Sequence, residues 1–209
     1  MYIKDFINDL NSDEFHRYRS FDYCYTYFHH VEGHASNRQN MIQSCYILWS
    51  YLASWGMLRG SSKLLQKNPY FLQKVITEID NCQHLYTHSV YDVDHYNDDT
   101  VCIDILIFYE RLKEALVGVS PTGTLITKIM LGTVGCVPAL DIYLKKALGI
   151  SGNDLTASVL QKKIYPLVKE IDLDLDIKAL DYMTNCPGNI SYTKAKLLDM
   201  YGFMKGQQE

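Results

Sequence analysis

The chain has 209 residues, of which 47% are hydrophobic, and its formal net charge is −4. That length and apolar content are enough to bury a sizeable core. Because the net charge is negative, the overall charge of the protein does not attract it to nucleic acid. The six cysteines have no close pair, which argues against a metal knuckle or an iron–sulfur cluster.

Hydrophobic residues recur at helical spacing along nearly the whole chain, and we find no sustained two-residue alternation. We therefore predict an all-α fold. The predicted helices cover residues 2–10, 13–32, 38–58, 69–80, 99–117, 122–132, 138–148, 154–164, 166–182 and 191–205.

The segment 81–99 has the weakest helical pattern and is predicted to be a loop or a lobe junction. We predict one all-α domain over residues 1–209, with two possible lobes, 1–98 and 99–209, and a ligand cleft between them.

The first ten residues carry Lys4 and Asp5, a pattern that does not fit a signal peptide. The most apolar stretch, 41–58, is interrupted by Gln43 and three serines, so we interpret it as a buried helix. These features predict a cytoplasmic protein.

Two histidine pairs, His30 with His34 and His84 with His88, have the four-residue spacing that places both rings on one helix face. Such a pair can begin a metal site. Because Gly33 interrupts the first pair and no HExxH pattern occurs, we expect hydrogen-bonding histidines, and no metal or other cofactor.

Tyrosines are unusually numerous, at 17, and several lie in "FDYCYTYFHH" at 21–30. Tyr25 in this run could stack against a planar ligand, or could simply face the core. Trp55 ends an apolar helix, and Arg59 and Lys63 follow it among small residues, where they could meet a phosphate. Plain helix packing followed by a helix end explains the same residues.

The segment "GVSPTGTLITKIMLGTVGCVPALDIYLKK", 118–146, predicts a turn, a helix with Lys128, a glycine-rich turn and a second helix. Pro138 fits the first turn of that second helix, which places Asp141 near its start. A carboxylate there is stabilised by the helix dipole, so Asp141 could be no more than a dipole-compensating acid.

This order of hairpin, lysine-bearing helix, glycine-rich connection, "VPALD" and basic helix resembles the helix-hairpin-helix DNA glycosylases. The stretches "YLASWGMLRGSS" and "YTKAKLLDMYGF" also resemble bacterial relatives of that fold, including a glycosylase type proposed to act in phage defence by excising heavily modified cytosine. Over 118–146 the resemblance rests on specific residues and their order. Elsewhere it is limited to the predicted arrangement of helices.

The resemblance implies a two-lobed helical fold in which Asp141 is the catalytic carboxylate. Lys128 falls near, but not at, the place where bifunctional members carry a Schiff-base lysine. Its spacing to Asp141 is shorter than in that pattern, so lyase activity is not expected. The hairpin "GVSPTGT" also lacks the tight GxG of the family.

The resemblance further implies DNA as the partner, double-stranded and with a flipped base. A flipped base needs aromatic side chains to hold it, and the candidates are Tyr25, Trp55 and Tyr143, with Asn40 as a polar contact. The candidates for phosphate contacts are the basic residues Arg59, Lys63, Lys145 and Lys146.

The sequence thus favours a DNA glycosylase that cleaves the N-glycosidic bond of a modified base, and the resemblance implies a role in antiviral defence. One alternative is a non-enzymatic helical module that binds DNA or protein, in which Asp141 is an exposed acid with no cleft over it. A further alternative is a helical toxin acting on RNA, which needs a histidine or acidic pair converging in a pocket.

Overall fold

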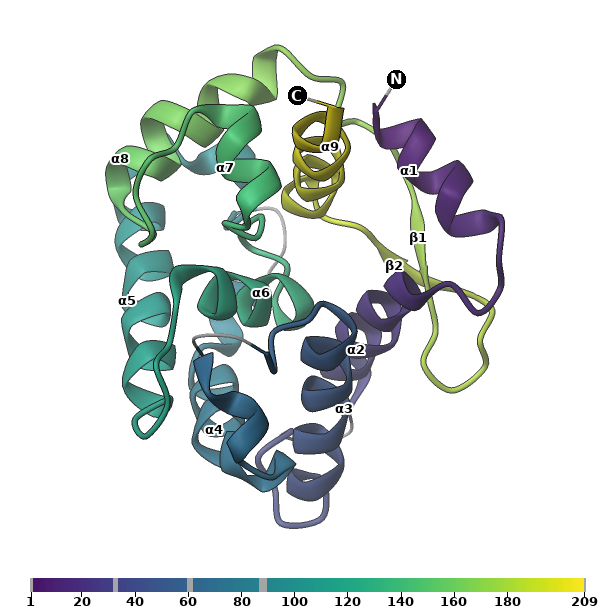
Figure 1. Ribbon diagram of the computed structural model, residues 1–209, viewed down its shortest axis with the longest axis vertical. Helices are drawn as coiled ribbons and strands as arrows, with labels where there is room; N and C mark the ends of the chain where they lie inside the picture. The colour runs from purple at the N-terminus through teal and green to yellow at the C-terminus, as the bar shows by residue number, and fades with distance from the viewer. Residues whose placement is uncertain (1, 32–33, 60–61, 87–89, 209) are drawn as a thin grey trace.

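The structure is a computed structural model that describes residues 2–31, 34–59, 62–86 and 90–208. Within these ranges the chain is mainly helical, as the sequence predicted, with a single two-stranded sheet (Figure 1). The helices are α1 (Tyr2–Asn11), α2 (Ser20–His30), α3 (Met41–Ser54), α4 (Gln73–Asn81), α5 (Asp99–Ala115), α6 (Gly123–Thr133), α7 (Ile142–Leu148), α8 (Ala157–Val159) and α9 (Lys194–Gln208).

Short helical turns connect these elements. α8 continues directly into a π-helical turn, Leu160–Ile164, and a 3-10 turn, Tyr165–Lys169. The remaining 3-10 turns in the described ranges are Arg17–Arg19, Leu64–Gln66, Pro69–Leu72, Gln83–Tyr86 and Val93–His95.

The strands β1 (Lys178–Leu180) and β2 (Pro187–Ser191) form an antiparallel hairpin, with Lys178 opposite Ser191. The predicted helix over 166–182 is therefore wrong beyond Lys169. Its hydrophobic residues in fact alternate with polar ones, a two-residue period that is typical of extended chain and that our reading of the sequence missed. The alternating residues are Ile171, Leu173, Leu175, Ile177 and Ala179.

The predicted helix over 13–32 is also too long, because α2 begins only at Ser20. Polar side chains hold the preceding residues in turns: Asp13 accepts a hydrogen bond from the Phe15 N–H at 2.8 Å, and His16 accepts from the Tyr18 N–H at 3.3 Å. Such local side-chain bonds compete with helix formation.

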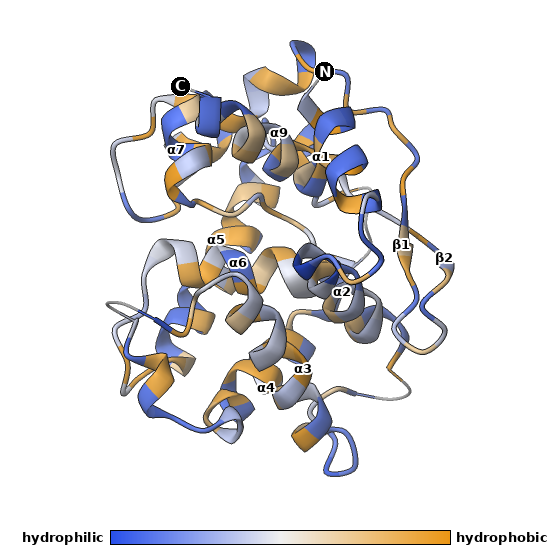
Figure 2. Ribbon diagram, turned by 45° about the vertical axis from the view of Figure 1, so that its right-hand side comes forward, coloured by the Kyte–Doolittle hydropathy of each residue, from blue (hydrophilic) through white to orange (hydrophobic). Residues whose placement is uncertain are grey.

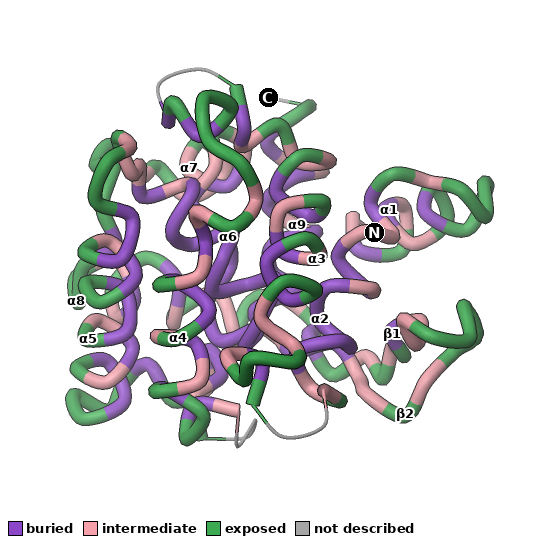
Figure 3. The backbone as a smooth tube through the Cα atoms, turned by 90° about the horizontal axis from the view of Figure 1, so that it is seen from below, coloured by how far each residue is buried: buried purple, intermediate pink, exposed green. Residues whose placement is uncertain are grey.

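α6 is the central helix of the fold, and α2, α3 and α5 all pack against it (Figure 1). All but one of its eleven residues, Thr124 being the exception, are buried, and its tube is buried along its length in Figure 3. Hydrophobic residues gather on these inner helices, whereas hydrophilic ones lie on the outer turns of α1 and on the loops (Figure 2). The buried hydrophobic residues form one cluster that runs from Ile3 to Phe203.

α9 packs against both α7 and α1, and its start is fixed by a distant carboxylate. Asp92 accepts hydrogen bonds from the Lys194 N–H at 2.7 Å and the Ala195 N–H at 2.8 Å, which are donors that a helix leaves unsatisfied. None of the described helices is long and apolar enough to cross a membrane. The division into lobes at residues 98 and 99 stays a prediction.

Candidate functional site

The connection from α6 to α7 is buried, and side chains bind its backbone from two directions. Thr127 of α6 accepts a hydrogen bond from the Leu140 N–H at 2.9 Å, and Thr124 donates to the Leu140 carbonyl at 2.7 Å. Asp199 of α9 accepts from the Ala139 N–H at 3.1 Å. Because buried backbone groups are satisfied in this way, the segment that leads to α7 has a fixed path.

Asp141 is the N-cap of α7, and its Oδ1 accepts hydrogen bonds from the Tyr143 N–H at 3.0 Å and the Leu144 N–H at 2.9 Å. The predicted helix start at Pro138 is wrong, because Thr127 and Asp199 hold Ala139 and Leu140 in the non-helical connection before α7. The prediction that Asp141 stands at a helix start is nevertheless confirmed, one position before the first helical residue. Capping fixes the carboxylate and leaves Oδ2 for another contact.

Lys128 of α6 provides that contact. Its Nζ lies 3.4 Å from Asp141 Oδ2 and 3.7 Å from Asp199 Oδ1, and only 1% of the residue is exposed. Among the described residues the amine has no hydrogen-bond partner in addition to these two ion pairs. A buried ammonium between two carboxylates is electrostatically compensated, although not held by a short hydrogen bond.

A second lysine completes the group. Lys196 Nζ lies 3.3 Å from Asp199 Oδ2 and 4.3 Å from the centre of the Phe21 ring. Burial lowers the pKa of Lys196, and the charge of Asp199 opposes that shift. We call these four residues, Asp141, Lys128, Asp199 and Lys196, the charge cluster; its charges sum to zero when all four are ionised.

Aromatic rings cover the charge cluster. Lys128 Nζ lies 4.0 Å from the centre of the Trp55 ring, and Tyr18 stacks on Trp55 with centroids 4.5 Å apart and planes 9° apart. Phe203 contacts both Trp55, at 6.2 Å, and Tyr143, at 5.1 Å. Of the predicted ligand-contacting residues, the structure therefore brings Trp55 and Tyr143 to the side of the cluster.

Asn40 and Tyr25 are placed differently. Asn40 precedes α3 while Trp55 follows it, which separates their backbones by about 20 Å along the helix. Its amide donates to the His34 carbonyl at 3.0 Å. Tyr25 is fully buried and packs on Phe21 at 5.1 Å, and burial raises the pKa of its hydroxyl. The core-facing interpretation of Tyr25 fits these contacts.

The basic residues Arg59 and Lys63 are exposed in the turn after α3. The backbone of Lys63 is left-handed, with φ 57°. This turn lies against the hairpin between α5 and α6, because the Ser62 carbonyl accepts a hydrogen bond from the Ser120 N–H at 3.1 Å. The structure thus brings Arg59 and Lys63 to the hairpin whose following helix carries Lys128.

The two basic residues of α7 differ from each other. Lys145 is half-buried and donates to Asn153 at 2.9 Å, whereas Lys146 is exposed. The segment that carries Asn153 packs directly on the start of α6, where a Cβ added to Gly123 would lie 1.8 Å from the Asn153 carbonyl oxygen. The starts of α6 and α7 therefore share one side of the molecule with Lys145.

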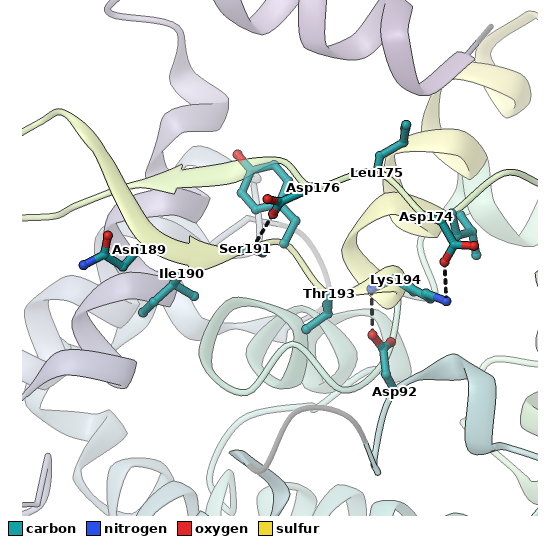
Figure 4. A pocket seen from close by; sticks show the side chains of 11 residues that line it. Asp92, Asp174, Leu175, Asp176, Asn189, Ile190, Ser191, Thr193 and Lys194 are labelled. Atoms are coloured by element: carbon teal, nitrogen blue, oxygen red, sulfur yellow. Dashed lines mark hydrogen bonds and ion pairs between the residues drawn. The ribbon is translucent and has the colours of Figure 1, made fainter.

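A pocket of 650 Å³ lies elsewhere, between residues 173–176, the end of β2 and the start of α9 (Figure 4). Its acidic groups are already paired: Asp174 lies 2.7 Å from Lys194, and Asp176 accepts a hydrogen bond from Ser191 at 2.7 Å. Asp141 and Lys128 line neither this pocket nor the three described on α3, α4 and α5.

The histidines contact side chains of other elements. His30 lies 3.4 Å from Asp181, and His34 is hydrogen-bonded to Gln83 at 3.0 Å. His84 contacts the Tyr91 ring, and His88 lies outside the described residues. In the described part of the chain, no group of three or more histidine, cysteine, aspartate or glutamate side chains is arranged to hold a metal ion.

Sequence reasoning missed Lys196 and Asp199 as members of the site. Both lie in "YTKAKLLDMYGF", and their three-residue spacing places them on one face of α9 among buried apolar residues. A lysine and an aspartate at that spacing inside an apolar helix are a signal of a buried ion pair. Which other helix they face cannot be read from that spacing.

Comparisons of the chain with protein-family models, with curated proteins and with solved structures found no match. The basis for a function is therefore the chemistry of the charge cluster and its surroundings.

Proposed function

We propose that the protein is a DNA glycosylase that hydrolyses the N-glycosidic bond of a flipped, modified base, with Asp141 as the catalytic carboxylate. The observation that carries this proposal is the setting of Asp141. Backbone N–H groups anchor one of its oxygens, a buried ammonium faces the other, and 15% of its side chain remains exposed. A carboxylate that is fixed, charge-compensated and accessible suits this reaction.

The chemistry requires a negative charge beside the sugar. As the glycosidic bond breaks, its electrons leave with the base, and positive charge develops on the sugar as an oxocarbenium ion. The Asp141 carboxylate would stabilise that charge and orient a water molecule toward the anomeric carbon. The water would lose a proton as its oxygen bonds to the sugar, and the departing base would take up a proton from solvent, so the products would be a neutral free base and an abasic sugar.

Lys128 supports the hydrolytic form of this reaction and not a lyase. A Schiff base needs a neutral amine with a free approach to the sugar. The Lys128 amine lies instead close to Asp141 and Asp199 and against the Trp55 ring, and only 1% of the residue is exposed, so it has no free approach to a sugar. Its role in the proposal is to compensate the charge of Asp141.

The surroundings of Asp141 supply elements that the reaction needs. A flipped base must be held by aromatic side chains, and Trp55 and Tyr143 are both partly exposed beside the cluster. Exposed basic side chains would contact the phosphates, and the candidates are Arg59 and Lys63 after α3 and Lys146 on α7. The resemblance of the sequence adds modified cytosine as the base and antiviral defence as the setting.

A non-enzymatic binding module is the second candidate, and one observation favours it. Asp141 serves as a helix cap and lines none of the four described pockets. In that case Asp141 has only a structural role, and its replacement changes stability without changing any reaction.

Base release from DNA distinguishes the two candidates. Genomic DNAs with ordinary and with glucosylated cytosines are incubated with wild type and with Asp141→Asn, and release is followed by mass spectrometry and alkali-induced strand breakage. We expect wild type to release a base and Asp141→Asn to lose at least roughly 100-fold in rate, because the stabilising charge is gone. The Asn side chain keeps an oxygen for capping, but it leaves Lys128 and Lys196 with one aspartate, so circular dichroism must show that the variant is folded under the conditions of the assay.

The matched control is Asp98→Asn. Asp98 caps α5 with a hydrogen bond from the Thr100 N–H at 2.8 Å, and it takes no part in the charge cluster. Equal rates for Asp98→Asn and wild type would exclude capping as the cause of the loss. If folded wild type releases no base from any of these DNAs, the glycosylase proposal is wrong and the binding module replaces it.

A further inference from the structure

Asp199 is the carboxylate of the charge cluster that contacts both of its lysines. Only 3% of the residue is exposed, yet its Oδ1 accepts a hydrogen bond from the Ala139 N–H at 3.1 Å and lies 3.7 Å from Lys128 Nζ. Its Oδ2 lies 3.3 Å from Lys196 Nζ. One carboxylate thus contacts the segment that leads to Asp141 and both buried lysines.

The position of the Lys128 amine depends on this arrangement. It lies at nearly equal distances from Asp141, 3.4 Å, and from Asp199, 3.7 Å. Two carboxylates that compete for one ammonium ion keep it from closing fully on either one. With Asp199 uncharged, the attraction toward Asp141 would be unopposed, and the ammonium would approach Asp141 Oδ2.

Such a shift would matter for a reaction at Asp141. An ammonium in direct contact with Oδ2 neutralises the charge that would otherwise act on the sugar, and it occupies the oxygen that would orient water. The other oxygen of Asp141, Oδ1, already accepts hydrogen bonds from two N–H groups of α7 and cannot replace Oδ2 in orienting water.

Lys196 pairs with the other oxygen of Asp199, because its Nζ lies 3.3 Å from Oδ2 while Lys128 faces Oδ1. An ion pair of this kind offsets part of the cost of burying a carboxylate. The aromatic rings of Phe21, Trp55 and Phe6 also face the Lys196 amine, at 4.3, 5.3 and 5.5 Å. Asp22 is the further carboxylate whose charge acts on it.

We propose that Asp199 is a positioning residue, which holds the Lys128 ammonium between two carboxylates and so keeps Asp141 Oδ2 available for reaction. The role in reaction rests on the proposed glycosylase function, whereas the placement of Lys128 does not. The two can therefore be tested separately.

Tryptophan emission tests the placement of Lys128 without any substrate. The chain has two tryptophans, so Trp49→Phe leaves Trp55 as the only emitter, with Lys128 Nζ 4.0 Å from its ring centre. In this background we expect Asp199→Asn to shift the emission maximum, because the ammonium moves away from the ring toward Asp141. Asp98→Asn, remote from the cluster, should leave the emission unchanged.

Kinetics test the role in reaction. Asp199→Asn leaves two buried lysines against one aspartate, so it should lower both stability and kcat. The double variant Asp199→Asn/Lys196→Met restores a neutral cluster and should recover most of the stability. We expect its kcat to stay roughly 100-fold below wild type, with KM little changed, because Lys128 still lies against Asp141.

Each outcome decides a specific claim. An unchanged Trp55 emission in Asp199→Asn would overturn the placement role, whatever the DNA assay gives. A stable double variant with wild-type kcat would show that Asp199 is only structural, which also overturns the inference. Absence of base release by wild type would overturn the proposed function, while an emission shift that Asp199→Asn causes with Lys128 present, and not in a Lys128→Met background, would still establish that Asp199 positions Lys128.

Discussion

Asp22 is a fully buried carboxylate whose partners only partly compensate it. Its oxygens contact the Arg19 guanidinium at 3.0 Å and accept a hydrogen bond from the Tyr192 hydroxyl. Burial raises the pKa of Asp22, while the Tyr192 hydrogen bond, the Arg19 contacts and the charge of Lys196 act in the opposite direction. The net rise means that the folded protein holds a proton on this residue more readily than the unfolded chain does.

The stability of the protein should report this shift. Because the pKa of Asp22 is higher in the folded protein than in the unfolded chain, the native state binds more protons at any pH between these two pKa values. The contribution of Asp22 to the free energy of unfolding therefore increases as the pH falls through that range. We expect the free energy of unfolding of wild type minus that of Asp22→Asn to be larger at pH 4 than at pH 7, as measured by urea denaturation.

Asp176 provides a control of opposite sign. It is exposed, and hydrogen bonds from Ser191 and Lys178 lower its pKa. Its contribution is present above the usual aspartate pKa and is lost as pH falls, so the corresponding difference for Asp176→Asn should decrease below about pH 4. A difference for Asp22→Asn that is the same at pH 4 and pH 7 would contradict the assignment.

At the scale of elements, α7 and α9 approach each other closely because glycines line their contact. A Cβ added to Gly202 would lie 2.2 Å from a methyl group of Leu144, and one added to Gly206 would lie 2.2 Å from the Tyr143 carbonyl oxygen. The second clash is with backbone, which cannot rotate away. This approach places Asp199 of α9 beside the segment that ends in Asp141.

Gly206→Ala should therefore destabilise the protein by about 1–3 kcal/mol, although alanine is the better helix former. The measurement is the midpoint and slope of urea denaturation. Gly152→Ala is the matched control, because a Cβ there meets nothing within 4 Å and the backbone φ is not positive. An effect of Gly206→Ala as small as that of Gly152→Ala would show that the two helices can separate without cost.

Sequence patterns predicted most of these helices but not how they meet. The amphipathic stretch at 99–117 matches α5 (Asp99–Ala115) to within two residues at its end, because its stripe of apolar residues is continuous. The turn before α7 and its aspartate could also be predicted from the sequence. The pairing of Lys128 with Asp199 could not be predicted, because tertiary packing alone brings α6 and α9 together, and helical periodicity carries no information about which helices contact each other.

At the scale of the whole molecule, the elements differ in how firmly they are held. α6 is buried on nearly all sides, whereas the hairpin of β1 and β2 has two strands, in which Ala179 is the one buried residue. A two-stranded hairpin is only marginally stable by itself, and such regions open locally more often than core helices. The interior around Lys128 should therefore open only when the whole protein unfolds.

Hydrogen exchange under native conditions measures this difference directly. Amides in the middle of α6 should exchange with the free energy of global unfolding, and amides of β1 and β2 should exchange faster, through local opening. Equal protection of Ile129 and Ala179 would contradict the expected order.

The Asp92 cap on α9 also affects how the protein acquires its structure. This carboxylate binds N–H groups that lie about one hundred residues further along the chain, and contacts so distant in sequence form slowly because a long loop must close. During synthesis, Lys128 and Asp141 leave the ribosome well before Asp199. We therefore expect the Lys128 ammonium to gain its second carboxylate only when α9 docks, in the same step that anchors this helix to Asp92.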